Sequence, residues 1–276
     1  MEPQATSVAT DVLDAVAEGR YPLPHDVLGA HLNDGVVTIR SVHHLADSVE
    51  VLTQDHTYPA THEHGGVWVC VFAAEDIPDY RLRVTYGDHS QVVDDPYRFL
   101  PTVGEMDTYL ISEGRHERLW EVLGAHLMHF DGVMGPVDGV AFAVWAPNAQ
   151  AVRVVGDFNF WDGTGHAMRT MGASGVWELF IPGVGVGARY KFEIQGPSGN
   201  WFQKADPMAR ATEIPPATAS VVTDVFHTWN DEDWLRARED ANPHNGPMSI
   251  YEVHAGSWKQ DLGYRGLADE LIPYVK

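Results

Sequence analysis

An internal repeat constrains this chain more than any single motif does. The paired segments, first copy before second, are GVV at 35–37 and GVA at 139–141, SVEV at 48–51 and AVRV at 151–154, GVW at 66–68 and GVW at 175–177, YRL at 80–82 and YKF at 190–192, and DPYR at 95–98 and DPMAR at 206–210. The separation between the copies changes only slowly along the chain, which indicates small loop insertions. A duplicated unit explains this order more economically than one large barrel or chance similarity between two Trp-bearing β-domains.

Each copy consists of short runs rich in β-branched and aromatic residues, separated by Gly, Pro, Asp and His. That pattern is typical of strands at the spacing of a sandwich. We therefore predict a mainly β fold with two tandem immunoglobulin-like β-sandwiches, over 21–103 and 129–228. Core packing is expected for the strand residues Trp68, Cys70, Trp145 and Trp177.

The segments outside the sandwiches differ in composition and in expected structure. Residues 1–20 are polar with a few valines at helical spacing, so a short helix and a flexible terminus are equally compatible with them. A connecting helix is expected over 104–128, and a linker over 229–246 with a helix at 231–240. Over 247–276 we expect the first strand, in the apolar run SIYEVHAGSW, and the helix start of a truncated (β/α)8 barrel.

Net charge and cysteine content exclude several classes of function. The chain of 276 residues carries a formal charge of −21, so its field repels nucleic acids and anionic membrane surfaces. A single cysteine allows no internal disulfide, and the first residues lack the basic and apolar regions of a secretion signal, so we expect a cytoplasmic protein. His62, Glu63 and His64 lack a third convergent ligand, and neither a metal nor another cofactor is expected.

Four long blocks, in order, carry a resemblance to a known family. They are YPLPHDVLGAH at 21–31, YRFLPTVGEMDTYLISEGRHERLWEVLGAH at 97–126, GVAFAVWAPNAQAVRVVGDFNFWDG at 139–163 and SIYEVHAGSW at 249–258. Together they closely resemble the N-terminal part of bacterial 1,4-α-glucan (glycogen) branching enzymes. The resemblance implies an N-terminal β-sandwich, a carbohydrate-binding module of family 48 over 129–228, and the start of a catalytic barrel of glycoside hydrolase family 13.

The resemblance also implies a reaction that this chain does not complete on its own. Branching enzymes transfer an α-1,4-glucan chain to a 6-hydroxyl with retention of configuration, which creates the α-1,6 branches of glycogen. Such chemistry needs a carboxylate nucleophile and a carboxylic acid about 5 to 5.5 Å apart, on loops at the C-terminal face of the barrel. No residue here matches the family's catalytic carboxylates, which lie on later strands. We therefore expect an inactive chain whose partners are α-1,4-glucan and the missing barrel.

The resemblance places candidate glycan-binding residues in the second module. They are Trp161, Lys191 and Trp201, with Asp157 and Asn159 as further polar contacts. Indole rings stack on the apolar face of a sugar, and a lysine donates hydrogen bonds to its hydroxyls. The alternative is that the tryptophans cap the core of the sandwich. A binding asparagine expected later in the module has no counterpart in TEIPPATASVV at 212–222.

Two other functions remain compatible with the sequence. The chain could be the N-terminal part of a debranching or trehalose-releasing enzyme of family 13, although the tandem sandwiches and the block GRHERLWEVLGAH favour branching. It could also be a stand-alone α-glucan-binding protein. Such a module would have no use for an unpaired apolar strand at 249–258, which is an aggregation liability.

Overall fold

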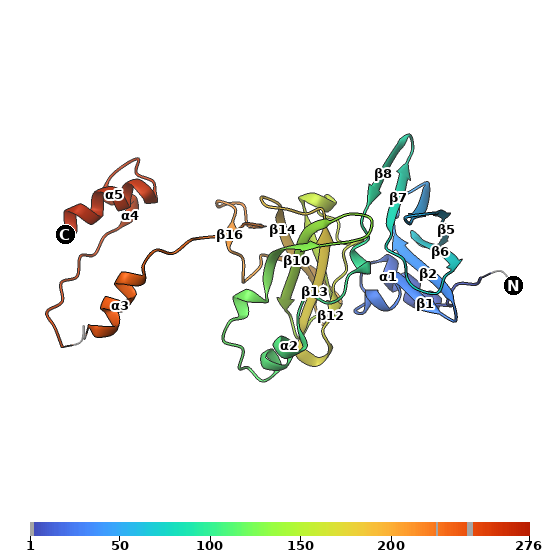
Figure 1. Ribbon diagram of the computed structural model, residues 1–276, viewed down its shortest axis with the longest axis horizontal. Helices are drawn as coiled ribbons and strands as arrows, with labels where there is room; N and C mark the ends of the chain where they lie inside the picture. Colours follow the sequence, from blue (N-terminus) through green and yellow to red (C-terminus); the bar gives the residue numbers. More distant parts are fainter. Residues whose placement is uncertain (1–2, 225, 242–244) are drawn as a thin grey trace. The chain divides into compact units, whose positions relative to one another are not determined.

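A computed structural model describes residues 3–224, 226–241 and 245–276 (Figure 1). The chain divides into two compact units, Met1–Val225 and Phe226–Lys276. The first unit holds both predicted sandwiches, and the second consists of short helices. The predicted fold class, mainly β with two tandem sandwiches, is confirmed.

The first sandwich pairs two four-stranded antiparallel sheets. One has the order β1-β2-β6-β5, with bounds Gly29–Asn33, Val36–Val42, Val67–Ala73 and Thr61–His64. The other has the order β4-β3-β7-β8, with bounds Thr57–Pro59, Ser48–Leu52, Arg81–Tyr86 and His89–Val93. Alternate residues of the central strands point inward and form one core, which includes Val37, Ile39, Val49, Val51, Trp68, Cys70, Leu82 and Val84.

The second sandwich repeats this plan. Its first sheet has the order β12-β13-β10-β9, with bounds Arg169–Thr170, Val176–Pro182, Val137–Trp145 and Gly124–Phe130. Its second sheet has the order β11-β14-β17-β16, with bounds Ala151–Gly156, Arg189–Gln195, Ser220–Val221 and Ala211–Thr212, and β15 (Trp201–Lys204) also pairs with β14. Short 3-10 turns η4 (Asp157–Asn159) and η5 (Gly172–Ser174) follow β11 and β12. The order β9-β10-β13 matches β1-β2-β6, so the repeat in the sequence is a repeat of topology.

One hexapeptide shows how closely the two copies agree. The sequence VLGAHL occurs at 27–32, entering β1, and again at 122–127, entering β9. Its glycines, Gly29 and Gly124, both have positive φ, +80° and +106°. A Cβ on Gly29 would lie 2.4 Å from the carbonyl oxygen of Tyr97, and one on Gly124 would lie 3.2 Å from that of Met208. Both positions therefore favour glycine for its conformation, and Gly29 also requires it for space.

The helix expected over 104–128 is much shorter than predicted. Helix α2 spans Glu105–Ser112, a 3-10 turn η3 spans Leu119–Glu121, and residues from Gly124 onward form β9. Gly114 and Gly124 both have positive φ, which ends a helical path. The residues of β9 pair in antiparallel register with β10, and this sheet pairing overrides the apparent helical spacing of the leucines.

Part of the N-terminal segment, residues 1–20, forms a helix. Helix α1 (Thr10–Ala17) buries Leu13, Val16 and Ala17 in a core shared with Phe142 and Val154 of the second sandwich. The 3-10 turn η2 (Pro96–Arg98) contacts β1 of the first sandwich and β13 of the second, and η1 (Pro24–Asp26) contacts η2. The hydroxyl of Tyr97, which belongs to η2, donates to the carbonyl oxygen of Gly165 at 3.1 Å and accepts from the amide of Ala167 at 2.9 Å.

The second unit contains three helices and no buried side chain among its described residues. They are α3 (Glu232–Asp240), α4 (Ala255–Trp258) and α5 (Tyr264–Val275). Helix α3 lies where the sequence predicts a helix, whereas residues 242–244 of the expected linker lie outside the described residues. The strand expected at 249–258 is not formed, because the described chain offers it no pairing partner. No helix among the described residues is both long enough and apolar enough to cross a lipid bilayer.

Candidate glycan-binding face

Two of the predicted site residues, Lys191 and Trp201, lie on one sheet of the second sandwich. Along β14, Tyr190 and Phe192 point into the core, so Lys191, Glu193 and Gln195 share the opposite face. In the antiparallel register Lys191 pairs with Val155 of β11, and Gln195 pairs with Trp201 of β15. Lys191 and Trp201 therefore belong to the same outer face, separated by four positions of β14, or about 13 Å.

The η4 turn positions the other predicted residues at the end of β11. Asn159 fixes this turn, because its Oδ1 accepts from the amide of Gly156 at 2.8 Å and its Nδ2 donates to the carbonyl of Val154 at 2.9 Å. Its Nδ2 also lies 3.0 Å from Nδ1 of His166. These contacts use both donors of the amide and one lone pair of its oxygen, so the geometry gives Asn159 a structural role.

Phe160 and Trp161 follow this turn in an unusual backbone conformation. Their φ angles are +54° and +62°, a region that non-glycine residues rarely adopt and that is found where surrounding structure holds it. The amide of Trp161 donates to the carbonyl of Gly156 at 3.0 Å, which closes the turn. As a result the Phe160 side chain is 94% exposed, while Trp161 is half-buried.

Asp157 is engaged by an arginine of the neighbouring strand. Its Oδ2 accepts from Nε of Arg189 at 2.8 Å and its Oδ1 accepts from an Nη of the same guanidinium at 3.0 Å. The pKa of Asp157 is held below its ordinary value, first by this side-chain hydrogen bond. Arg189 also contacts Glu213 at 3.2 Å. The carboxylate therefore meets a ligand only through lone pairs that the arginine does not use.

Lys191 is held toward the segment in which the expected asparagine is absent. Its Nζ donates to Oγ1 of Thr218 at 2.8 Å. An ammonium has three donors, so two remain for hydroxyl groups of a ligand. Thr218 lies in the stretch TEIPPATASVV and is a polar neighbour of Lys191 that the sequence does not single out.

Trp201 is stacked against a residue that motif reasoning misses. The guanidinium carbon of Arg153 lies 3.8 Å from the centre of the Trp201 ring system. The same guanidinium contacts Oε2 of Glu193 at 2.6 Å and the carbonyl oxygen of Glu18 at 2.9 Å. One face of the indole is therefore covered by a fixed cation, and a sugar meets the other face or displaces Arg153.

Strand alternation could have identified these missed residues. Arg153 and Glu193 are opposite each other in the β11–β14 register, on the same outer face as Lys191. Once the two runs AVRVVG and RYKFEIQ are aligned as neighbours, opposite charges at directly paired positions are expected to meet. Asp157 is bonded to Arg189 at one end of this face, with the side chain of Trp161 hydrogen-bonded to Asp157. Trp201 lies at the other end, beside Gln195, with Lys191 and Glu193 between.

Two family models match the chain, one for each sandwich. The N-terminal domain model of the alpha-1,4-glucan branching enzyme GlgB matches residues 9–97. The model of carbohydrate-binding module 48, also described as the isoamylase N-terminal domain, matches residues 122–209. The second match contains all five predicted site residues, from Asp157 in the η4 turn to Trp201 in β15.

Relatives resemble the chain over almost its whole length. The 1,4-alpha-glucan branching enzyme GlgB of Thermobifida fusca is 54% identical over 266 residues, which are 96% of this chain and 36% of the relative. That of Leifsonia xyli subsp. xyli is 52% identical over 272 residues, again 96% of this chain and 36% of the relative. The chain thus spans little more than a third of the length of these curated relatives.

Similarity among solved structures is more distant. The type I pullulanase of Bacillus subtilis, complexed with maltose, aligns with 73% of this chain and 27% of its own, at a TM-score of 0.32 and 17% identity. The family assignment depends on the two family models and on the sequence relatives, which agree in order and in extent. The chain therefore belongs to the family of 1,4-alpha-glucan branching enzymes of the GlgB type and corresponds to the N-terminal portion of its members.

Proposed function

We propose that this chain supplies the glucan-binding and scaffold modules of a 1,4-α-glucan branching enzyme. In the whole protein, a barrel bearing the catalytic carboxylates would transfer α-1,4-glucan chains to 6-hydroxyls, and this chain without it would be inactive. The relatives' name and their greater length support the proposal. A branching assay on the isolated chain should give no product above the blank, and any activity would refute this part of the proposal.

The outer face of β11, β14 and β15 is the proposed glucan-binding surface. The observation that carries it is the row formed by Lys191, Glu193 and Gln195 between two half-buried tryptophans, Trp161 and Trp201. A glucan chain presents apolar C–H faces and hydroxyls in alternation, which suits indole rings flanking polar side chains. The ammonium of Lys191 and the carboxylate of Glu193 provide donors and an acceptor for those hydroxyls.

Retention of the purified chain on an amylopectin matrix tests this surface. The double variant Trp161→Ala/Trp201→Ala should lose retention, because both stacking platforms are removed. Trp145→Ala is the matched control: this tryptophan is 55% exposed, but it lies on β10 in the other sheet. Circular dichroism establishes that each variant is folded. Unchanged retention of the folded double variant would overturn the proposed surface.

We also propose a cytoplasmic location. The single thiol, Cys70, is buried in the first sandwich, and burial raises its pKa to about 11. A thiol of that kind stays protonated and unreactive, as expected of a protein that keeps a free cysteine in a reducing compartment. Fractionation of the native host, with the protein detected by antibody, is the direct test.

A further inference from the structure

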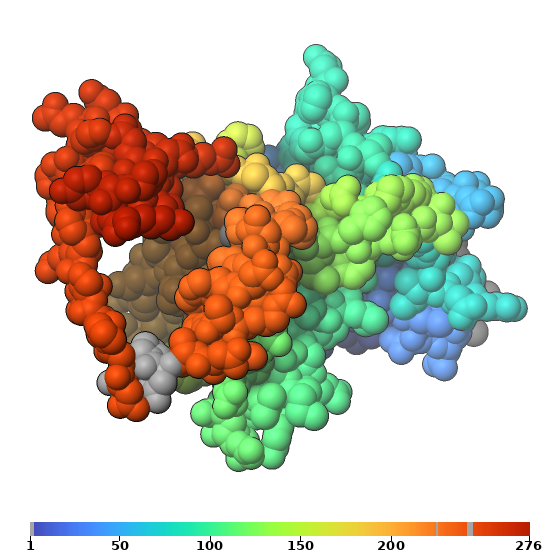
Figure 2. All heavy atoms as spheres, turned by 60° about the vertical axis from the view of Figure 1, so that its left-hand side comes forward, coloured from blue at the N-terminus to red at the C-terminus, as the bar shows by residue number. Residues whose placement is uncertain are grey.

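The sequence contains a single Asn–Gly pair, Asn245–Gly246, which belongs to the second unit. Both residues are exposed, and neither belongs to a helix or a strand. Residues 245–252 are exposed throughout, and Figure 2 shows this segment, in orange-red, as a narrow chain of atoms. Water and hydroxide therefore reach both the Asn245 side chain and the peptide bond that follows it.

An exposed asparagine side chain can react with the peptide nitrogen of the next residue, which makes asparagine a thermolabile residue. After a base removes its proton, the amide nitrogen of Gly246 attacks Cγ of Asn245 and closes a five-membered succinimide ring. The bond between Cγ and Nδ2 breaks, and the proton returns through solvent to the departing nitrogen, which leaves as ammonia. Water then opens the ring at either carbonyl and leaves an aspartate or an isoaspartate. Over both steps one water is consumed and one ammonia is released.

Glycine in the second position removes the main obstacle to this attack. Gly246 has no Cβ to crowd the closing ring, and its backbone adopts conformations that other residues disfavour. Within the part of the chain that the structure describes, the Gly246 amide donates no hydrogen bond to another backbone group. No such bond therefore has to break before the nitrogen can attack.

The asparagines at the other described positions are less suited to this reaction. Each precedes a residue that carries a side chain; they are Asn33, Asn148, Asn159, Asn200 and Asn230. Asn159 is further restrained, because its Nδ2 donates to the carbonyl oxygen of Val154 at 2.9 Å. Asn230 is exposed and also belongs to the second unit, so it differs from Asn245 mainly in its neighbour, Asp231.

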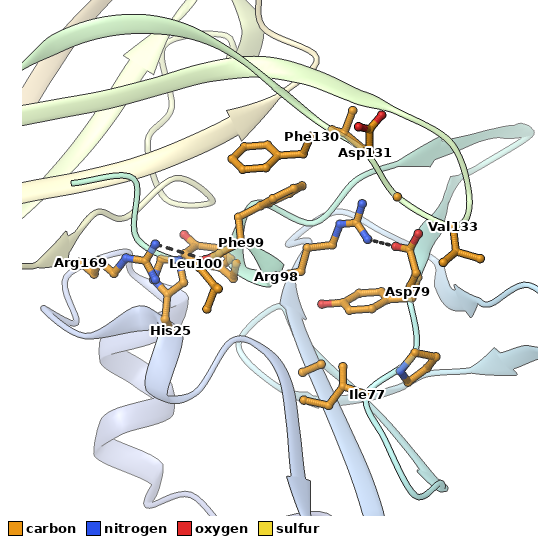
Figure 3. Close-up of a pocket in the computed structure, with 16 residues that line it drawn as sticks. His25, Ile77, Asp79, Arg98, Phe99, Leu100, Phe130, Asp131, Val133 and Arg169 are labelled. Carbon is orange, nitrogen blue, oxygen red and sulfur yellow. Dashed lines mark hydrogen bonds and ion pairs between the residues drawn. The ribbon is translucent and has the colours of Figure 1, made fainter. Parts of the chain in front are cut away.

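An Asp–Gly pair forms the same ring more slowly, because a carboxylate is a poorer electrophile than an amide. Asp131–Gly132 is such a pair, in the loop after β9 that lines a cavity of about 880 Å³ in the first unit (Figure 3). The amide of Met134 in this loop donates to Oδ2 of Asp79 at 2.8 Å. The carbonyl oxygen of Gly132 accepts from the amide of Gly135 at 3.1 Å. Asp131–Gly132 is therefore an internal comparison whose backbone is held by hydrogen bonds.

We propose that Asn245 is a site of spontaneous deamidation, which converts Asn245–Gly246 into aspartyl-glycine and isoaspartyl-glycine. Either product adds one negative charge at pH 7 to a chain that already carries −21. The isoaspartyl product also adds a methylene to the backbone, because the chain then continues through the former side-chain carbonyl. This change falls shortly before the apolar run SIYEVHAGSW at 249–258 and alters the path of the chain into it.

Incubation of the purified 276-residue chain at pH 8 tests the proposal. An acidic form should accumulate on isoelectric focusing, several times faster than at pH 7, because the attacking nitrogen must lose its proton. Mass spectrometry of the tryptic peptide 239–259 should locate the change at Asn245. The other asparagine of this peptide, Asn242, precedes a proline, whose nitrogen carries no hydrogen and cannot close the ring. Hydroxylamine, which cleaves the succinimide, should release fragments 1–245 and 246–276.

Three variants separate the reaction at this pair from other chemistry. Gly246→Val should slow the appearance of the acidic form by at least about tenfold, because a branched side chain crowds the attacking nitrogen. Asn245→Gln should slow it as well, because a glutamine would have to close a six-membered ring. Asn230→Gln is the matched control and should leave the rate unchanged. All three positions are exposed, so circular dichroism should show no loss of folded structure.

A synthetic peptide with the sequence of residues 239–259 sets the time scale. The proposal is supported if the acidic form of the chain maps to Asn245 and is suppressed by Gly246→Val and Asn245→Gln but not by Asn230→Gln. It is overturned if the chain stays unchanged while the peptide deamidates completely, because the folded chain would then protect the pair. It is also overturned if the modified residue is Asn230 or Asp131 instead of Asn245.

Discussion

The hydroxyl of Tyr80 donates a hydrogen bond to Oδ2 of Asp95 at 2.7 Å in the interior of the first sandwich. The second copy preserves the pair, with Tyr190 donating to Oδ2 of Asp206 at 2.5 Å. In each copy the other carboxylate oxygen accepts the amide of the residue two positions on, Tyr97 or Met208. The duplicated sequence thus conserves a buried polar contact as well as the pattern of apolar residues.

Tyr80→Phe should destabilise the first unit by about 1–3 kcal/mol, because it leaves a buried carboxylate oxygen without its donor. Urea unfolding at pH 7, followed by circular dichroism, measures the change. Tyr86→Phe is the control: Tyr86 is half-buried, and its loss of a hydroxyl should cost less than about 0.5 kcal/mol. Equal effects of the two substitutions would contradict a stabilising role for the Tyr80–Asp95 bond.

Gly29→Ala should cost several times more stability than Gly35→Ala. Both glycines have similar positive φ, +80° and +75°, so both substitutions incur the backbone strain of about 1–2 kcal/mol. Only Gly29 also faces a carbonyl oxygen at 2.4 Å from the added Cβ, whereas nothing lies within 4 Å at Gly35. Urea midpoints of the two variants measure the difference. Similar midpoints would mean that the chain near Tyr97 yields without cost.

Stability should fall as pH decreases from about 6.5 toward 4. Burial lowers the pKa of His43 and of His166 to about 4, and that of His25 to about 3, so the unfolded chain binds more protons in this range. Stability lost on acidification follows from that difference. Asp95 acts in the opposite sense between 3.8 and about 6, because burial raises its pKa, but the three histidine shifts are larger in sum.

Urea midpoints measured at pH 7 and pH 4.5 test this expectation. His43→Leu should flatten the dependence by removing one of the three groups. His89→Leu, on the exposed strand β8, should leave the dependence unchanged. A midpoint that rises on acidification would show that the buried carboxyl groups outweigh the histidines.

Trypsin should cleave the second unit while the first resists. Arg236 and Arg238 lie on the exposed helix α3, and no side chain of this unit is buried among the described residues. The first unit instead has two packed hydrophobic cores. Its arginines are largely held in ion pairs, such as that of Arg153 with Glu193. Mass spectrometry of a time course should show a stable product ending near residue 236 or 238. Protection of these two bonds would indicate that the second unit is packed against a partner.

The features that could be predicted from the sequence are those whose neighbouring strands lie in the same copy of the repeat. The tandem sandwiches were predictable because each strand has its neighbours in the same copy. The connecting helix was predicted too long because leucine spacing at 119–127 mimics a helix, although the second VLGAHL marks the entry to β9. The prediction of a strand at 249–258 was wrong because strand formation depends on a neighbouring strand.

The candidate face was only partly predictable. Trp161, Lys191 and Trp201 follow from the resemblance, and they lie on or beside one sheet face. The stacking of Arg153 on Trp201 depends on cross-strand register, which a motif does not encode. The motif also does not reveal that the side-chain amide of Asn159 hydrogen-bonds to the backbone at the η4 turn. Trp145, assigned to the core from its strand position, is 55% exposed because it ends β10.

Leu13, Val16 and Tyr97 belong to the core of the second sandwich although they lie outside it in the sequence. The structural boundary of this module therefore differs from its boundary in the sequence. A carbohydrate-binding module excised at residue 129 would lose β9 and the helix that covers one end of its own interior. Helix α1, near the start of the chain, packs into the core of the second sandwich, which comes later in the sequence. The second sandwich therefore completes its interior with residues that precede it in the chain, and we expect an excised module to be less stable than the same module within the first unit.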